Sequence, residues 1–354
     1  MQIHGVDHVE FYVGDAQQAA FYLCTAFGFR VSGQGGPETG LEGARSLLLS
    51  QGGVRLLLTT GLDSRHPATE YVRRHGDGVG VIAMGVDDVQ ESFTTLTGRG
   101  APALEEPRTL EANGATVRTA VVAGFGDVTH RLVERHGNAE EFLPGLIDLI
   151  APDVEEGEHL FSVVDHAAVL VPAGELGPTV DYYRDVFGFD NIFQEFIEVG
   201  DQAMDSKVVQ SESGKVTFTI IEPVTSRRAG QIDDFLARHG GAGVQHLALL
   251  TDDIVSAVQT LEGRGVRFLK APSSYYDELE NRLGEPDLRT ADLRETNVLV
   301  DQDHWGQVFQ IFAQSMHVRR TYFFEVIDRH GARTFGSGNV KALYEAVERE
   351  KANV

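Results

Sequence analysis

The chain has 354 residues, 42% hydrophobic and 23% charged, a composition typical of a soluble globular protein with room for two domains. Its 53 acidic and 30 basic residues give a net charge of −23 without a basic cluster, which argues against nucleic acid and anionic membranes as partners. We expect a soluble, cytoplasmic protein, because the N-terminus lacks a signal-peptide pattern and no apolar run approaches the roughly 20 residues that span a bilayer.

The first predicted unit is a strand, a helix and a returning strand within residues 6–29. It begins with the alternating run VDHVEFYV and turns at Gly14-Asp15. It continues as an amphipathic helix over residues 16–26, which ends at Phe-Gly-Phe. Two β-rich runs within residues 46–60 then flank a short glycine turn, which predicts a hairpin.

The same plan recurs in the second half of the chain. Asp7-His8 matches Asp165-His166, a helix at residues 178–186 again ends at Phe-Gly-Phe, and a second hairpin is predicted at residues 207–221. A further pair of copies, GDGVGVIAMGVDD from Gly76 and GAGVQHLALLTDD from Gly241, aligns without a gap. Each half closes on a similar run, HRLVERHG or FFEVIDRHG. The internal repeat therefore covers most of the chain.

This repeat predicts an α+β fold built from tandem βαβββ modules, two in each half of the chain. We place a first domain at residues 1–151 and a second at residues 152–354, with the seam in the acidic stretch 152–158. The second half carries two additions. They are a long loop at residues 271–297 and a C-terminal helix at residues 340–351.

Three positions of the repeat indicate a metal site in the second half only. That half has His166, His246 and Glu325, where the first half has, in the same order, His8, Val81 and Arg131. A valine cannot bind a metal and an arginine would repel one. The alternative is that the two histidines are core residues and that Glu325 pairs with an arginine, but this does not explain why all three stand at matching positions.

The ligand types narrow the choice of metal. The single cysteine, Cys24, excludes a disulfide within the chain and a cysteine-rich cluster, so a metal would need nitrogen and oxygen ligands. Two histidines and one carboxylate leave coordination positions open and suit iron(II) that also binds substrate and dioxygen. Zinc is the second choice because it is more often four-coordinate.

The pattern VDH…GVQHLAL…FFEVIDRHG, with QIF at residues 310–312 and FGxGN at residues 335–339, resembles the 4-hydroxyphenylpyruvate dioxygenase family of the vicinal oxygen chelate superfamily. The resemblance covers nearly the whole chain. It implies that each module pair curls into an open barrel and that His166, His246 and Glu325 bind ferrous iron, Fe(2+). It also implies 4-hydroxyphenylpyruvate and dioxygen as substrates, and a homo-oligomer, either a dimer or a tetramer.

The family contains two activities that share oxidative decarboxylation of this substrate. One hydroxylates the ring to give homogentisate, and the other, 4-hydroxymandelate synthase, hydroxylates the benzylic carbon. Thr219 and Ile221 replace the proline and asparagine of the dioxygenase pattern, Val340 replaces a phenylalanine, and DHWGQVFQIF at residues 303–312 is more similar to the synthase. We therefore expect 4-hydroxymandelate as product, because Val340 leaves room for the ring to turn away from the oxidant.

The resemblance adds further pocket residues, although ordinary strand packing is an alternative for each of them. Ser206, Gln245 and Gln310 would orient the 2-oxo acid or the phenol. The other substrate-binding candidates are Thr219, Ile221, Gln231, Phe312, Phe323, Phe335 and Val340, of which the phenylalanines would exclude water. Two other functions stay open, namely the dioxygenase that forms homogentisate and a metal-free protein that sequesters a ligand.

Overall fold

The computed structural model describes residues 1–138, 141–151, 159–336, 338, 339 and 341. The first half of the chain forms two βαβββ modules. The first module consists of β1 (Ile3–Tyr12), α1 (Ala16–Tyr22), β2 (Arg30–Gly35), β3 (Ala44–Gln51) and β4 (Val54–Gly61). The second consists of β5 (Gly78–Val86), α3 (Val89–Gly98), β6 (Ala103–Ala112), β7 (Ala115–Ala123) and β8 (Thr129–Gly137). Helix α2 (Pro67–His75) joins the modules, and β9 (Asp148–Leu149) adds an edge strand.

The second half repeats this plan with an insertion in its last module. The third module consists of β10 (Val163–Leu170), α4 (Leu176–Tyr182), β11 (Asp190–Val199), β12 (Gln202–Gln210) and β13 (Thr217–Pro223). Helix α5 (Gln231–His239) leads to the fourth, which consists of β14 (Gly243–Leu250), α6 (Ile254–Gly263), β15 (Leu299–Gln302), β16 (Gln307–Phe312) and β17 (Phe323–His330). The prediction of tandem βαβββ modules in an α+β fold is confirmed.

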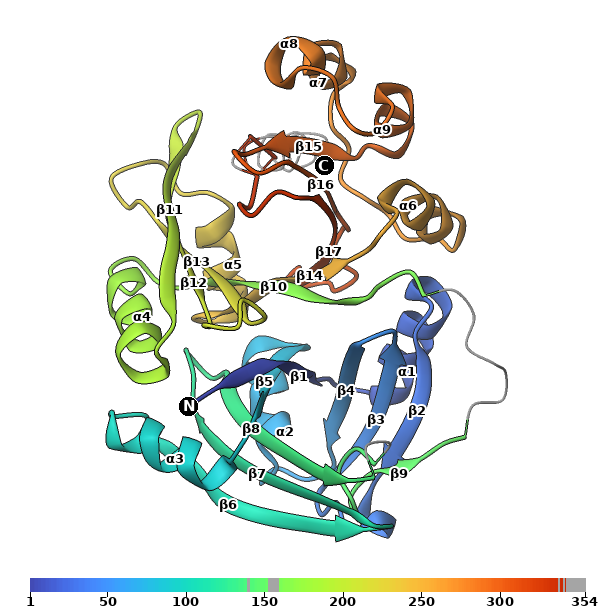
Figure 1. The fold of residues 1–354 in the computed structure, drawn as a ribbon, viewed down its shortest axis with the longest axis vertical. Helices are drawn as coiled ribbons and strands as arrows, with labels where there is room; N and C mark the ends of the chain where they lie inside the picture. Colours follow the sequence, from blue (N-terminus) through green and yellow to red (C-terminus); the bar gives the residue numbers. More distant parts are fainter. Residues whose placement is uncertain (139–140, 152–158, 337, 340, 342–354) are drawn as a thin grey trace.

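The modules of each half join into one curled sheet, and the two sheets lie one above the other (Figure 1). The first is nine-stranded in the order β6-β7-β8-β5-β1-β4-β3-β2-β9, and the second is eight-stranded in the order β11-β12-β13-β10-β14-β17-β16-β15. The described residues include no helix long and apolar enough to cross a membrane.

Two details of the secondary structure differ from the sequence prediction. The insertion at residues 271–297 is not a plain loop, because it forms the short helices α7 (Ser273–Asp277), α8 (Leu279–Leu283) and α9 (Thr290–Thr296), whose Tyr276, Leu279 and Leu293 are buried. Helices α2 and α5 between the modules were not anticipated. The predicted seam at residues 152–158 and the predicted C-terminal helix, apart from Lys341, lie outside the described residues.

The two halves share one apolar core. Its largest cluster contains residues of both sheets, and the ring centroids of Phe11 on β1 and Phe324 on β17 are 6.1 Å apart. A smaller apolar cluster fills the opposite face of each sheet. Because side chains alternate along a strand, Leu247 and Leu249 point into the shared core while His246 points to the inner face of the second sheet.

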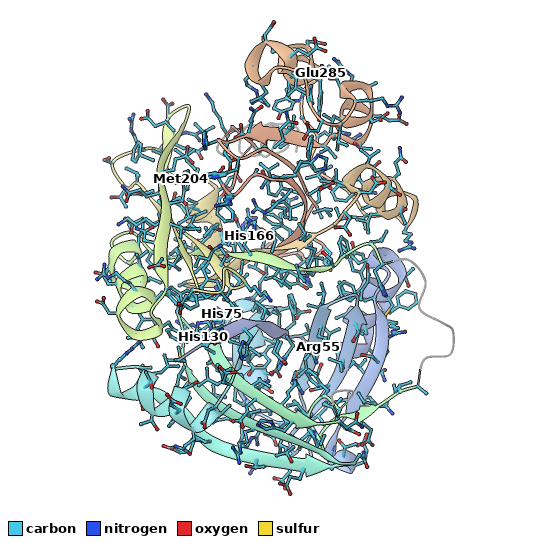
Figure 2. All side chains as sticks on the ribbon, in the orientation of Figure 1. Arg55, His75, His130, His166, Met204 and Glu285 are labelled. Atoms are coloured by element: carbon cyan, nitrogen blue, oxygen red, sulfur yellow. The ribbon has the colours of Figure 1, made fainter. Side chains whose placement is uncertain are left out.

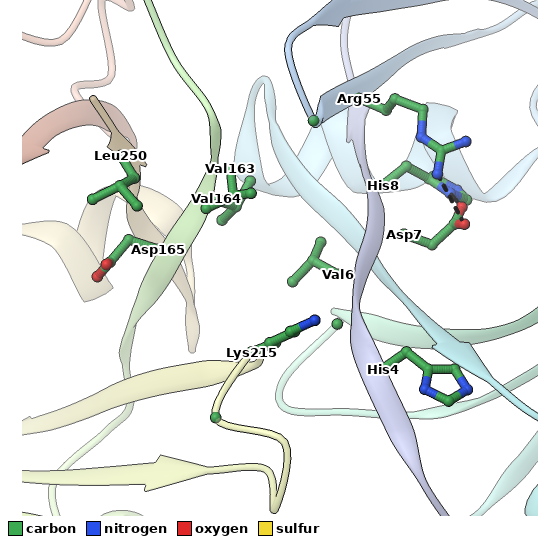
Figure 3. A pocket seen from close by; sticks show the side chains of 13 residues that line it. His4, Val6, Asp7, His8, Arg55, Val163, Val164, Asp165, Lys215 and Leu250 are labelled. Atoms are coloured by element: carbon green, nitrogen blue, oxygen red, sulfur yellow. Dashed lines mark hydrogen bonds and ion pairs between the residues drawn. The ribbon is translucent and has the colours of Figure 1, made fainter. Parts of the chain in front are cut away.

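Each half also contains the same bulge on its first strand. The pairing of β1 with β5 shifts between Val6 and His8, and that of β10 with β14 shifts between Val164 and His166. Asp7 and Asp165 are the extra residues. Figure 3 shows them on the two sides of a cavity of about 420 Å³ between the halves.

The aspartate in each bulge forms a two-pronged ion pair with an arginine of the closing strand. Arg135 contacts Asp7 at 2.7 and 2.8 Å, and Arg329 contacts Asp165 at 2.7 and 2.8 Å. Burial alone would raise the pKa of Asp7, but hydrogen bonds from Arg135 and His8 outweigh burial and hold it well below 3.8. The carboxylate of Asp7 therefore stabilises the fold above pH 3.8, and this contribution is lost as the pH falls further.

Replacing Asp7 with asparagine should lower the free energy of unfolding by about 3 kcal/mol, since it leaves the partly buried guanidinium of Arg135 without its partner charge. Urea denaturation near neutral pH measures this loss. Asp185→Asn, which breaks an exposed ion pair with Arg184, is the matched control and should leave the urea midpoint nearly unchanged. Equal midpoints for the Asp7 variant and the wild type would contradict the structural role given to this pair.

Candidate metal centre

The three expected metal ligands lie together on adjacent strands of the second sheet. His166 is on β10, His246 on β14 and Glu325 on β17, and these strands are neighbours in that sheet. Their ligand atoms all lie within 4.8 Å of one another. His166 is labelled in Figure 2 inside the curve of the second sheet. The three side chains are almost fully buried, so they converge in a space with little water.

Strand pairing explains why these side chains meet. Ala248 pairs with both His166 and Glu325, and His246 pairs with Ala168 two residues further along β10. Paired residues of neighbouring strands point to the same face of a sheet. Hence the register alone brings two imidazoles and a carboxylate to the inner face.

The charges of the group are coupled. The carboxylate Oε2 of Glu325 lies 3.1 Å from His246 Nε2 and 3.5 Å from His166 Nε2. Burial acts to raise the pKa of Glu325, but the charge of His166 and hydrogen bonds from both histidines outweigh it and bring that pKa to about 2. Burial acts to lower the pKa of His166, yet Glu325 and Asp165 raise it to about 9. Burial lowers the pKa of His246.

A hydrogen bond to the preceding residue fixes each imidazole. Asp165 Oδ1 lies 2.8 Å from His166 Nδ1, and Gln245 Oε1 lies 3.2 Å from His246 Nδ1. Consecutive side chains on a strand normally point to opposite faces, but both contacts occur at bulges in the β10–β14 pairing. With Nδ1 donating to these oxygens, each Nε2 is free to bind a metal.

The carboxylate of Glu325 is held through a chain of side-chain amides. The amide of Gln310 donates to Glu325 Oε1 at 2.7 Å, that of Asn339 donates to Gln310 at 2.9 Å, and the hydroxyl of Tyr275 donates to Asn339 at 3.1 Å. This leaves Oε2 facing the histidines. The roles of Asn339 and Tyr275 were not recognised from the sequence, where Asn339 was noted as part of FGxGN and as the N-cap of the predicted C-terminal helix.

Three other expected pocket residues lie on the same face as the ligands. Thr219 pairs with Ala168, which pairs with His246, while Ile221 pairs with Ser206. Ser206, Thr219 and Ile221 are all buried, and Ile221 packs in the apolar cluster of the inner face.

The aromatic residues expected in the pocket surround the histidines. Phe323 stacks on His246 with ring centroids 5.0 Å apart, and Phe312 lies 6.0 Å from the same imidazole. Phe335 meets His166 edge-on at 5.0 Å. Gln231 begins α5 and shares a pocket with Phe323. Val340 lies outside the described residues.

The corresponding position of the first half holds a guanidinium. Arg131 Nη1 lies 2.8 Å from Glu10 Oε2 and 3.1 Å from His8 Nε2. The hydroxyl of Thr59 also donates to Glu10 at 2.7 Å. A fixed cation therefore balances the buried carboxylate there, and His-His-Glu is the candidate metal group found in the described part of the chain.

Known proteins that share one name align with nearly the whole chain. A family model described as Glyoxalase/Bleomycin resistance protein/Dioxygenase superfamily matches residues 5–134 and 163–287. The chain is 35% identical to 4-hydroxyphenylpyruvate dioxygenase of Aspergillus fumigatus, over 98% of this chain and 93% of the relative. The 4-hydroxyphenylpyruvate dioxygenase of Xenopus tropicalis is 34% identical, over 97% and 90%.

Among solved structures, a mutant of 4-hydroxymandelate synthase from Streptomyces coelicolor superposes with a TM-score of 0.91 at 42% identity. The match covers 99% of this chain and 100% of that chain. The expected pair of open barrels agrees with this similarity and with the two curled sheets.

Metal affinity should rise as the pH increases from 6 to 9, because a metal must displace the proton that His166 holds up to a pKa of about 9. Glu325, with a pKa of about 2, is ionised throughout this range. Titration of the metal-free protein with iron(II) under nitrogen, at several pH values, measures the effect. An affinity that does not change with pH would contradict the assigned ligands.

Glu325→Gln should weaken metal binding more than about 100-fold, since it removes the anionic ligand itself rather than a supporting group. The matched control is Glu280→Gln on α8, where the carboxylate is exposed and far from the three ligands in sequence and fold. This control should bind iron(II) as the wild type does.

Proposed function

Because the chain belongs to the glyoxalase, bleomycin resistance protein and dioxygenase superfamily, and within it to the 4-hydroxyphenylpyruvate dioxygenase family, we propose that it is a 4-hydroxymandelate synthase. The reaction would convert 4-hydroxyphenylpyruvate and dioxygen to 4-hydroxymandelate and carbon dioxide. One oxygen atom enters the new carboxylate and the other the benzylic carbon. The dioxygenase class follows from the family, whereas the product is the proposed part.

The inner face at Thr219 and Ile221 is the observation that carries this choice. Ile221 is 9% exposed and packs in an apolar cluster with Leu170 and Phe312, so at this position the inner face is apolar and offers no amide to a substrate, although Thr219 beside it carries a hydroxyl. A substrate ring there is held by packing and not by a hydrogen bond, which permits it to lie away from the metal while the benzylic carbon lies near. The 42% identity to the Streptomyces coelicolor synthase supports the same choice.

The donor set fits iron(II), because two neutral imidazoles and one carboxylate on one side leave positions for substrate and dioxygen. When bound there, iron(II) would supply dioxygen activation and a Lewis acid for the 2-oxo acid. The protein itself orients the metal ligands and keeps water out of the site. Asp165 and Gln245 orient the two imidazoles, Gln310 orients Glu325, and the phenylalanines around the histidines limit the access of water.

The two halves of the chain would have different roles. The described ligands and inner-face residues come from the second half, so we assign residues 152–354 as the catalytic domain and residues 1–151 as a domain without a metal. We also infer a homo-oligomer, as in the family.

Formation of homogentisate is the alternative, and it is supported by the 4-hydroxyphenylpyruvate dioxygenases that the chain resembles at 35% and 34% identity. A metal-free ligand-sequestering protein is a weaker candidate. It would not require a buried carboxylate between two imidazoles, each already oriented through its Nδ1.

The iron-loaded protein, incubated with 4-hydroxyphenylpyruvate and dioxygen, should form 4-hydroxymandelate as its main product, because the apolar inner face favours benzylic hydroxylation. Chromatographic analysis of the products measures this. Homogentisate as the main product would overturn the assignment.

Ile221→Asn tests the part played by the apolar wall. An amide at this position gives the substrate a hydrogen-bonding partner and should raise the ratio of homogentisate to 4-hydroxymandelate about 10-fold, equivalent to about 1.4 kcal/mol between two transition states. Ile221→Val is the matched control, since it keeps the wall apolar and should keep the product ratio.

A further inference from the structure

A pocket of about 150 Å³ opens beside α5, next to the candidate metal centre. Its walls come from α5, β14, the loop that follows β16, and the first residue of β17. Gln245 and Phe323 line it, and both contact His246, the first through Nδ1 at 3.2 Å and the second through ring stacking at 5.0 Å. One layer of side chains therefore separates this pocket from a metal ligand.

Two arginines line this pocket from different elements, Arg238 near the end of α5 and Arg320 in the loop before β17. Both are exposed, and neither side chain forms a hydrogen bond or an ion pair with another described residue. Asp234 is the acidic residue of the lining. The local balance is thus two positive charges against one negative charge, in a chain whose net charge is −23.

Among the described residues, Arg267 also lacks a carboxylate contact, and what sets Arg238 and Arg320 apart is that both line one pocket, whereas several other arginines of the second half are paired. Arg329 forms a two-pronged ion pair with Asp165, and Arg227 pairs with Glu198. Arg238 and Arg320 have no such carboxylate partner among the described residues. Two guanidiniums without one, at the rim of the same pocket, therefore form an attractive site for an external anion.

The backbone at Arg320 supports a ligand-related role. Its φ of +54° is in the left-handed region, which is unfavourable for a residue other than glycine. The preceding Arg319 donates to the carbonyl of Arg74 at 2.8 Å and so ties the loop to the first half. Arg319 therefore contacts the first half, while Arg320 lines the pocket. Residues with such a strained backbone conformation are frequent at ligand sites.

We propose that this pocket is the access site for the anionic substrate, in which Arg238 and Arg320 attract the carboxylate of an aromatic 2-oxo acid before it reaches the metal centre. The choice of an aromatic 2-oxo acid as the ligand rests on the proposed function. The guanidinium fork matches a carboxylate, while Phe235, Leu269 and Phe323 of the same lining offer an apolar surface to the ring. A local positive field is needed because a protein of net charge −23 repels an anion.

The test measures dioxygen consumption by the iron-loaded protein with 4-hydroxyphenylpyruvate, at low and at high salt. The double variant Arg238→Gln, Arg320→Gln should lower kcat/KM about 10-fold at low salt through KM, with kcat within two-fold, and each single variant should lower it about 3-fold. The decline of kcat/KM with salt seen in the wild type should flatten in the double variant, because salt screens the attraction that the arginines supply.

Arg267→Gln is the matched control, since Arg267 is an exposed arginine on the segment after α6 and is not part of the pocket lining. It should keep both kcat/KM and its salt dependence. Wild-type values of these two quantities in the double variant would overturn the proposal. So would an equal loss of affinity for the neutral methyl ester of the substrate, because that loss would not depend on charge.

Failure of the proposed function can be told apart from failure of this proposal. Dioxygen consumption does not depend on which product forms, so homogentisate would leave the test intact. If the wild type consumes no dioxygen, calorimetric binding of 4-hydroxyphenylpyruvate replaces turnover. Weaker binding to the double variant than to Arg267→Gln then supports the access site, and equal binding overturns it.

Discussion

The structure depends on the burial of one carboxylate. Glu325 is 1% exposed, and an ionised carboxylate taken out of water costs several kcal/mol unless positive charge and hydrogen-bond donors surround it. The second half meets this cost with two imidazoles and the Gln310 amide, an arrangement that a metal ion completes. The first half buries Glu10 and meets the same cost with Arg131. One fold thus supports two solutions to the same electrostatic constraint.

The scaffold around these carboxylates is common to both halves. Each first strand has a bulge that turns an aspartate toward the neighbouring histidine, and each aspartate is clamped by an arginine of the closing strand. Because the ion pair between aspartate and arginine is also present in the half without the metal ligands, its role is to stabilise the module and not to bind a metal. At the site the two halves differ at three positions, because His246, Glu325 and Ala168 of the second half stand where the first half has Val81, Arg131 and Glu10.

Much of this was accessible from the sequence, because repeat copies can be compared position by position and strand alternation then puts His166, His246 and Glu325 on one face. The same logic could not find contacts that arise from loops. Tyr275 comes from an insertion without a counterpart in the repeat, and Asn339 follows the last strand. The helices of residues 271–297 were missed, since their buried anchors are few and the segments short. The pairing state of Arg238 and Arg320 depends on tertiary neighbours that no sequence pattern reveals.

The number of iron(II) ions bound per chain tests the central claim most directly. Anaerobic titration of the metal-free wild type should give one ion per chain. His246→Val, which copies Val81 of the first half, should give none at the same concentrations. Two ions bound to the wild type, or one retained by His246→Val, would contradict a single centre formed by His166, His246 and Glu325.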